Sequence, residues 1–372
     1  MPDPDEVTIT IGAHEFAGFD EFTLESSVDN LADGFVFTAP FDPSNADWDA
    51  QTDPFKYQGV QIKIGGELAL TGILDKPKFV DGVEASTVTL EGRSLSGQLI
   101  DCSIDASDYE FTGLKLSEIA RKLCKPFGIA VVVGVDTVEK RVTVNDVKMS
   151  ATYGGRDYAY NETVLENTLQ EAKAKIGQKA YDFLNSLANR KRILLTSDPS
   201  GRLVLRQPAG TSKPVGAIIA GTSPYISGEA TYDGSARFSL YKVLYQEPGT
   251  PDVIGEASDP GVRLYRPLVD TESESEALDT VSPVQFVRAH ALAKCVGITV
   301  TLAGWRNAAG LLWRKTDVVT LLAPKLKVKK ESAFVVAGVT LKKSAKDGKT
   351  AVLRLVLPGT YTGQLPGSYP WA

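Results

Sequence analysis

The stretch VQIKIGGELAL, residues 60–70, decides the fold class. Every second residue is apolar on both sides of Gly65 and Gly66, which is the spacing of a strand with one buried face. Two adjacent glycines supply the positive φ angles that a tight turn needs. The sequence therefore predicts an antiparallel hairpin at this place.

The same alternation extends outward from this hairpin. Residues 7–11 (VTITI) and 87–91 (TVTLE) also place apolar and polar side chains on opposite faces. Several short alternating strands separated by turn residues are typical of sandwiches and barrels. We therefore expect residues 1–97 to form an antiparallel sandwich or barrel, assigned here as a first β-barrel.

A middle region, residues 98–207, mixes helical and strand patterns. Residues 114–123 have helical spacing, and residues 129–133 form a short apolar strand candidate. A hairpin is predicted around a type I turn at residues 198–201. A second helix is predicted from Glu162 to Leu187, with Gly177 as the place where it would kink or split. The prediction rests on apolar residues at steps of three and four: Leu165, Leu169, Ala172, Ile176, Ala180, Phe183 and Leu187.

Strand patterns return after residue 208 and are interrupted between about 247 and 314. The interruption holds a helix candidate with Phe286, Ala289 and Leu292 on one face, and a strand at residues 298–302 ends it. The fold class expected is multidomain α+β. The domains expected are 1–97, 98–207, a second β-barrel from 208–246 and 315–360, an inserted α/β domain at 247–314, and a tail at 361–372.

An internal similarity links the two β regions. Gly72 precedes Asp81 by nine residues and Gly338 precedes Asp347 by the same distance, with a lysine four residues after each glycine. An Asp-Gly turn follows a strand in both places. Because Asp-Gly is a common turn, chance is one explanation. Two related β-barrels in one chain are the other.

Charge and composition exclude some function classes. The formal net charge is -6, which argues against a general nucleic-acid binder, although an acidic wall can repel passing DNA. A lysine cluster has no interleaved aromatic residue, so we favour protection of an edge strand or a partner contact over nucleic-acid binding. The cluster consists of Lys325, Lys327, Lys329, Lys330, Lys342 and Lys343.

Catalytic and metal motifs give no positive signal. His14 and His290 lie in no HExxH pattern, and both are interpreted as structural histidines. No cofactor or metal is predicted. Paired carboxylates for sugar cleavage are an alternative for Glu162, Glu166, Glu171 and the acidic run at 270–279, but a solvated surface is favoured. The cysteines, read as small buried hydrophobes, are Cys102, Cys124 and Cys295.

No targeting segment is expected. The first residues lack a basic region followed by an apolar one, and no run reaches about 18 apolar residues. We therefore expect folding in a cytoplasm and no membrane insertion by this chain.

Four segments, in order, resemble the baseplate hub proteins of contractile-tailed phages, the Mu-like and late-control tail protein family. They are residues 88–103 (VTLEGRSLSGQLIDCS), 124–133 (CKPFGIAVVV), 180–208 and 304–324. The residues that carry the resemblance as a structural signature are Gly92, Arg93, Ser94, Leu99, Asp101, Cys102, Trp305, Gly310 and Trp313. From the residues alone, Trp305 and Trp313 are packing anchors at a strand–turn–strand corner.

The resemblance implies a non-enzymatic hub in the virion. Its three copies would close a ring in which two barrels per subunit imitate sixfold symmetry. The implied partners are the tail tube protein, the central spike protein, other baseplate proteins and DNA in transit, with host cytoplasm as the place of assembly. Two alternatives stay open: a tail-associated peptidoglycan or polysaccharide hydrolase, and a type VI secretion spike-base module.

Overall fold

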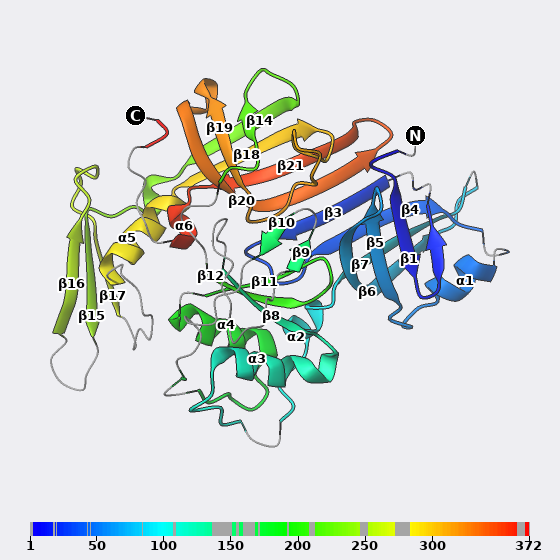
Figure 1. The fold of residues 1–372 in the computed structure, drawn as a ribbon, viewed down its shortest axis with the longest axis horizontal. Helices are drawn as coiled ribbons and strands as arrows, with labels where there is room; N and C mark the ends of the chain where they lie inside the picture. Colours follow the sequence, from blue (N-terminus) through cyan, green and yellow to red (C-terminus); the bar gives the residue numbers. More distant parts are fainter. Residues whose placement is uncertain are drawn as a thin grey trace.

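The computed structural model describes most of the chain. The described residues are 3–17, 19, 21–42, 44, 46–83, 85–106, 109–135, 151–153, 156–158, 168–169, 172–191, 193–207, 213–245, 252–271, 283–362 and 369–371. Within these ranges, no helix combines the length and apolar character needed to cross a bilayer. Elements of the chain are mostly strands, and a large sheet runs along the top of the molecule (Figure 1).

The N-terminal part of the large sheet, called the first β unit, contains the predicted hairpin. Ile62 lies opposite Leu70 in an antiparallel pair, and Gly65 and Gly66 have φ angles of +58° and +81°. The hairpin prediction is confirmed. The unit consists of β1 (Val7–Ile11), β2 (His14–Phe16), β3 (Glu21–Ser27), β4 (Gly34–Pro40), α1 (Ala46–Thr52), β5 (Gly59–Ile64), β6 (Glu67–Val80) and β7 (Thr87–Ser94).

The C-terminal part of the same sheet, called the second β unit, comes from strands far apart in the sequence. Its last hairpin turns at Asp347 and Gly348, as predicted, and Gly348 has a φ of +64°. The unit consists of β13 (Ala217–Ile219), β14 (Tyr225–Tyr232), β18 (Val296–Ala303), β19 (Val318–Ala323), the short helix η4 (Pro324–Leu326), β20 (Val328–Ser344) and β21 (Gly348–Val356).

The two units share one strand order. In the first unit the neighbours run β3-β4-β7-β6-β5, and in the second they run β14-β18-β21-β20-β19. The strands enter these positions in the same chain order, and every pair among them is antiparallel. The two units therefore have related arrangements of five strands.

The structural register of the repeat differs from the one that the sequence suggested. β6 shifts register between Leu74 and Lys76, and β20 shifts register between Val336 and Gly338. When the two bulges are superimposed, Lys76 is the counterpart of Gly338. The sequence had instead matched Gly338 with Gly72, which lies four residues earlier. The prediction chose the right strands and the wrong register, because the spacing of glycine, lysine and Asp-Gly on which it rested does not follow the pairing of the strands.

A hydrogen bond supports the corrected register. The Leu74 N–H donates to the Gln58 carbonyl at 2.9 Å, and the Val336 N–H donates to the Asp317 carbonyl at 2.8 Å. Each donor lies just before the bulge of its long strand, and each acceptor precedes the neighbouring strand. The same backbone contact therefore recurs in both units.

The units join edge to edge. β3 pairs with β20, with Ser27 opposite Gly338 and Phe22 opposite Lys343, so the sheet is continuous across 13 strands. The sheet is antiparallel except where β13 runs parallel to β19. One hydrophobic core spans both units, from Ile9 and Phe37 to Val300 and Leu353. Closed barrels stay a prediction.

The middle region lies below the large sheet in Figure 1 and has its own core. A three-stranded sheet packs against helices whose apolar faces carry Leu116, Ile119, Phe183 and Leu187. Its elements are α2 (Gly97–Asp101), α3 (Leu116–Cys124), η1 (Lys125–Phe127), β8 (Val131–Val135), β9 (Ala151–Tyr153), β10 (Arg156–Tyr158), α4 (Ala180–Arg190), β11 (Leu194–Ser197) and β12 (Leu203–Gln207).

The helix predicted from Glu162 to Leu187 forms only from Ala180 onward, and the prediction is wrong for the described residues before Ala180. α4 begins only at Ala180, and Ile176 is 88% exposed. The segment before it is tied in extended form to the chain near Phe111, whose N–H donates to the Ala172 carbonyl at 2.7 Å. Apolar residues at helical steps are thus buried here by a long-range contact. Residues 162–167 lie outside the described residues.

A small sheet protrudes from the second unit at the lower left of Figure 1. It consists of β15 (Leu240–Tyr245), β16 (Asp252–Ser258) and β17 (Pro267–Thr271), follows η3 (Gly234–Ala236), and packs against the predicted helix, α5 (Pro283–Lys294). The strand predicted to end the inserted region does not belong to it, because β18 pairs with β14 and β21 in the large sheet. The short helix α6 (Gly359–Thr362) lies beside α5.

Candidate functional site: a three-way junction

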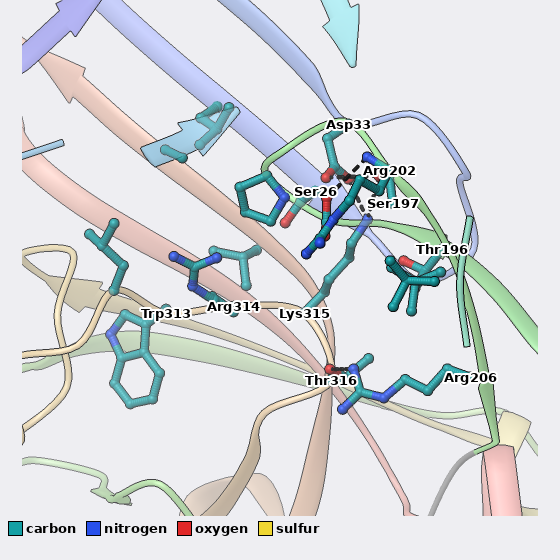
Figure 2. A pocket seen from close by; sticks show the side chains of 18 of the residues that line it. Ser26, Asp33, Thr196, Ser197, Arg202, Arg206, Trp313, Arg314, Lys315 and Thr316 are labelled. Carbon is teal, nitrogen blue, oxygen red and sulfur yellow. Dashed lines mark hydrogen bonds and ion pairs between the residues drawn. The ribbon is translucent and has the colours of Figure 1, made fainter. Parts of the chain in front are cut away.

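Three parts of the chain meet around a cavity of about 110 Å³. Its walls come from β3 and β20 of the large sheet, from β8, β11 and β12 of the middle region, and from the loop between β18 and β19 (Figure 2). We call this place the three-way junction. It fixes the two β units and the middle region against one another.

A buried ion pair forms the centre of the three-way junction. The Lys315 ammonium donates to the Asp33 carboxylate at 2.6 Å, and Ser197 donates to the same carboxylate at 3.2 Å (Figure 2). Asp33 comes from the first unit, Lys315 from the second, and Ser197 from the middle region. Each of the two charged side chains is 9% exposed. One hydrogen-bonded group therefore contacts all three parts.

Burial sets the electrostatics of this pair. Loss of water raises the pKa of the Asp33 carboxyl, while the charge and hydrogen bond of Lys315 act in the opposite direction. The backbone around Asp33 is also held, since its N–H donates to the Ser94 hydroxyl at 3.0 Å. A buried charge that loses its partner is costly, so the pair fixes one arrangement of the parts.

Arginines extend the contact along the loop between β18 and β19. Arg314 and Arg306 both bind Glu67 at the start of β6, and Arg306 also donates to Asp5 at 2.8 Å. On the opposite side, Arg206 of β12 donates to Thr316, and burial lowers the pKa of Arg206 to about 10. The loop thus binds the first unit with two arginines and receives one from the middle region.

The signature residues of the first unit lie beside this junction. Arg93 binds Asp75 at 2.9 Å and Asp101 at 2.5 Å, and so ties β6 to α2. These hydrogen bonds lower the pKa of Asp101. Ser94 and Leu99 are buried.

Two further signature positions are Gly92, which leaves no room for a side chain, and Cys102. A Cβ at Gly92 would lie 2.2 Å from the Ile73 carbonyl oxygen and 2.4 Å from the Phe35 ring. The Cys102 carbonyl accepts from Ala180 at the start of α4 at 3.1 Å. Cys102 itself is only half-buried, which corrects its prediction as a buried hydrophobe.

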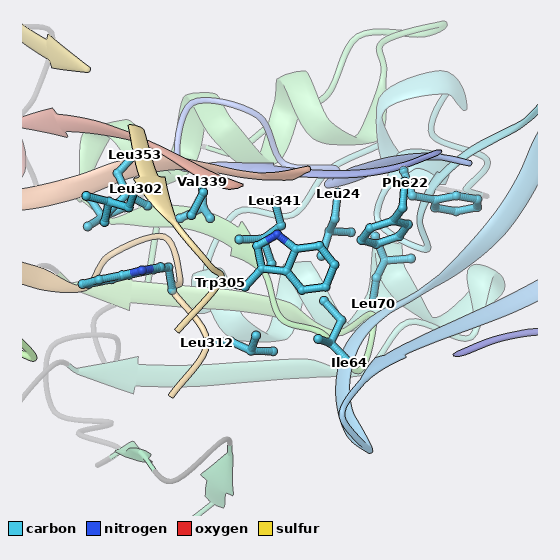
Figure 3. Close-up of a cluster of buried hydrophobic side chains, with 14 of the residues drawn as sticks. Phe22, Leu24, Ile64, Leu70, Leu302, Trp305, Leu312, Val339, Leu341 and Leu353 are labelled. Atoms are coloured by element: carbon cyan, nitrogen blue, oxygen red, sulfur yellow. The ribbon is translucent and has the colours of Figure 1, made fainter. Parts of the chain in front are cut away.

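The signature residues of the second unit form the predicted corner. Trp305 is fully buried, and its indole N–H lies 3.0 Å from the Lys342 carbonyl and 3.1 Å from that of Thr350 (Figure 3). Trp313 is buried, and its backbone N–H donates to the Trp305 carbonyl at 3.0 Å. Gly310 turns the chain between them with a φ of +77°. The prediction of packing anchors is confirmed.

The environments of Cys124, Cys295 and His290 are those of residues that contribute to packing. Burial raises the pKa of Cys124 to about 12, and Cys295 is also buried, as predicted. The His290 ring makes a 2.8 Å hydrogen bond with the Thr360 carbonyl, and burial lowers its pKa, so it is a satisfied structural histidine. His14 lies in β2, paired with Ile11.

The lysine cluster named from the sequence does not line the junction cavity. Lys325 lies within η4, Lys327 follows it directly, and Lys329 and Lys330 lie near the start of β20. Lys342 and Lys343 lie farther along β20, opposite β3. Glu162, Glu166, Glu171 and residues 272–279 lie outside the described residues, so the alternative of paired carboxylates stays a prediction there.

Sequence reasoning missed the central residues of the junction. Asp33 and Lys315 are separated by 282 residues. Lys315 lies in the segment 304–324 that carries the family resemblance, but nothing in that segment indicates that its partner is Asp33. The arrangement is suited to holding parts of a protein in place.

Comparisons with known proteins agree on one group. A family model described as baseplate hub protein gp44-like, second domain, matches residues 96–152. The chain is 25% identical over 360 residues to baseplate hub protein gp44 of Escherichia phage Mu, covering 93% of this chain and 86% of that protein.

Solved structures show the same fold. The 43 kDa tail protein of prophage MuSo2 from Shewanella oneidensis aligns with a TM-score of 0.75 and 23% identity, over 96% of this chain and 99% of that one. The E. coli c3393 protein, described as a type VI secretion component similar to T4 tail proteins gp27 and gp5, aligns with a TM-score of 0.54 and 9% identity. That alignment covers 98% of this chain and 78% of the other.

Proposed function

Because the chain belongs to the gp44-like family of phage baseplate hub proteins, we propose that three copies form a ring that joins a sixfold tail tube to a threefold central spike. The family places the chain among structural components of the phage tail. The trimer, the two contacts and a channel for DNA are the proposal. So is the absence of enzymatic activity.

The single observation that carries the proposal is the repeated strand order. A ring of three chains would contain six β units with the order found in β3-β4-β7-β6-β5 and β14-β18-β21-β20-β19. Such a ring can present six similar surfaces to a sixfold tube while its remaining parts keep threefold symmetry. Rings of this kind close when one surface of a subunit binds a different surface of the next.

The three-way junction supports the same function. A ring that transmits force needs its two β units at a fixed angle, and the buried pair of Asp33 and Lys315 is made only at one arrangement of the parts. The arginine contacts to Glu67 add a second connection between the units. The junction therefore has the character of a joint that resists movement.

The experiment is to measure the mass and shape of the purified chain. Light scattering should give a particle of about 120 kDa, three times the 40.0 kDa chain, and electron microscopy should show a ring with a central channel. A chain that stays monomeric at every concentration tested contradicts the proposed ring. Clearing of peptidoglycan in a zymogram would instead favour a tail-associated hydrolase.

A type VI secretion spike base is the second candidate, since the fold resembles that of the E. coli c3393 protein. The family match favours the phage tail. Pull-down of the chain with the tail tube protein of its own phage should succeed under the first proposal. Binding only to a secretion tube protein would favour the second.

A further inference from the structure

The second half of the long strand β6 has one open edge. Residues 76–80 pair with β7 on one side, and no described strand pairs with the other side. β5 covers that side only up to Ile73. Phe79 and Val80 are 42% and 46% exposed there. A strand edge with exposed apolar side chains is a template for another strand.

The counterpart of this edge in the second unit is covered. β19 covers the first half of β20, and β3 covers the second half, from Gly338 to Lys343. Lys76 is the counterpart of Gly338, so the open stretch of β6 corresponds to the stretch of β20 on which β3 lies. Within one chain, this kind of edge is therefore already paired once, by β3 on β20.

The strand that corresponds to β3 also has an open edge. β14 occupies the position of β3 in the second unit and pairs only with β18 among the described strands. Its exposed residues include Ile226 at 54% and Tyr232 at 40%. Each copy of the chain therefore carries one open edge of the β6 kind and one of the β3 kind, at opposite ends of the sheet.

We propose that β14 of one copy pairs with β6 of the next copy in the register that β3 adopts on β20. This inference rests on the proposed trimer and identifies its interface. The bulges make Thr38 of β4 the counterpart of Thr301 of β18, through their partners on β7 and β21. Glu21 faces Thr38 and Ser227 faces Thr301, so Glu21 corresponds to Ser227 and, six residues later, Ser27 corresponds to Asp233.

The transferred register defines every opposed pair. Ser27 opposite Gly338 becomes Asp233 opposite Lys76, and Leu24 opposite Leu341 becomes Ala230 opposite Phe79. The full set of predicted pairs is Asp233 with Lys76, Tyr232 with Pro77, Thr231 with Lys78, Ala230 with Phe79, and Glu229 with Val80.

The faces of the two strands agree in this register. Ala230 lies opposite buried Ile298, and Phe79 lies opposite buried Val88, so both face the core side of the sheet. A slip of one residue would place Phe79 opposite a residue of the outer face. The register therefore continues the apolar face of the sheet from one copy to the next.

The charges are complementary on the outer face. Lys76 and Lys78 would lie beside Asp233 and Glu229, and opposite charges across strands stabilise a pair. Within its own chain Lys76 also binds Glu91 of β7 at 3.0 Å, so in the proposed pair its ammonium would lie between the carboxylates of Glu91 and Asp233. Pro77 lacks one backbone donor, so this ladder is one hydrogen bond shorter than that between β3 and β20.

Cysteine cross-linking tests the register directly. Val28 N–H donates to the Ala337 carbonyl, which makes the next pair, Ser27 and Gly338, a non-hydrogen-bonded one. Such pairs have Cα atoms about 4.5 Å apart, within the range of a disulfide. Lys76→Cys combined with Asp233→Cys should therefore give covalent trimers on a non-reducing gel.

The matched control is Lys78→Cys with Asp233→Cys, which differs by one step along the same face. It should cross-link at least about tenfold more slowly, because diagonal neighbours lie about 7–8 Å apart. Equal linking by both pairs, or linking by the control alone, overturns the register.

Charge reversal gives a second, independent measurement. Lys76→Glu should weaken trimer formation by about tenfold or more, and Lys76→Glu with Asp233→Lys should restore it. The Asp233 carboxylate also accepts a hydrogen bond from the Ser235 N–H at 2.8 Å at the start of η3. Asp233→Asn removes the charge but keeps an oxygen that can accept this bond, so it measures the effect of the charge alone. Lys122→Glu, on the exposed face of α3, should leave the trimer unchanged.

The outcomes separate this inference from the function on which it rests. A wild-type trimer that neither cross-links through residues 76 and 233 nor responds to charge reversal overturns the interface and leaves the hub proposal standing. A wild-type chain without any trimer contradicts both. Circular dichroism on each variant confirms that loss of the trimer is not loss of the fold.

Discussion

The first and second β units share five strands in one order but differ in how their long strands are completed. β20 is flanked on its second half by β3, whereas the matching half of β6 is open. The units also differ just before the bulge of the long strand. There Leu74 of β6 lies opposite Gly92, whereas Val336 of β20 lies opposite Leu355. A repeated arrangement of strands can therefore keep its pairing scheme while its packing and its edges take separate roles.

The joint between the units should give the largest stability effect. Lys315→Met leaves the Asp33 carboxylate buried without its cation, and we expect a loss of about 3–5 kcal/mol in the free energy of unfolding. Urea unfolding followed by fluorescence measures this loss.

A matched control for this joint is Lys349→Met, because the pair of Lys349 with Asp3 is much more exposed. Loss of an exposed pair should cost less than about 1 kcal/mol. Asp33→Leu with Lys315→Met should recover most of the stability, since both charges are then absent. Equal losses for Lys315→Met and Lys349→Met would show that the buried pair does not hold the units together.

The difference between Gly92 and Gly338 should give the next largest effect. Gly92→Ala places a Cβ 2.2 Å from a backbone oxygen, and overpacking of this kind costs about 1–3 kcal/mol. Gly338→Ala meets no atom closer than 3.5 Å and should change stability by less than about 0.5 kcal/mol. Thermal unfolding of both variants compares the two units, and a larger loss for Gly338→Ala would reverse the interpretation.

Local patterns in the sequence predicted the strands well, because alternation in residues 60–70 and the turn at Asp347 depend only on near neighbours. The helix predicted from Glu162 failed where Ala172 is held by a distant backbone contact. The register of the repeat was missed because a bulge leaves no mark on residue type. Asp33 and Lys315 meet only through the assembled fold, so no local pattern announces them.

The smallest effect concerns acid stability at the end of the first unit. The Arg93 guanidinium holds the pKa of Asp101 below its ordinary value of 3.8, so the folded state favours the ionised form more than the unfolded state does. This stabilisation is fully present above the ordinary pKa and is lost as the pH falls through the lowered folded value. Because the pair is partly exposed, we expect it to contribute less than about 1 kcal/mol. Asp101→Asn should therefore lower the melting temperature slightly at pH 6, and the difference from wild type should shrink as the pH falls toward 2. A difference that grows with acid would mean that the folded state favours the protonated carboxyl, and that Arg93 does not stabilise the charge that ties β6 to α2.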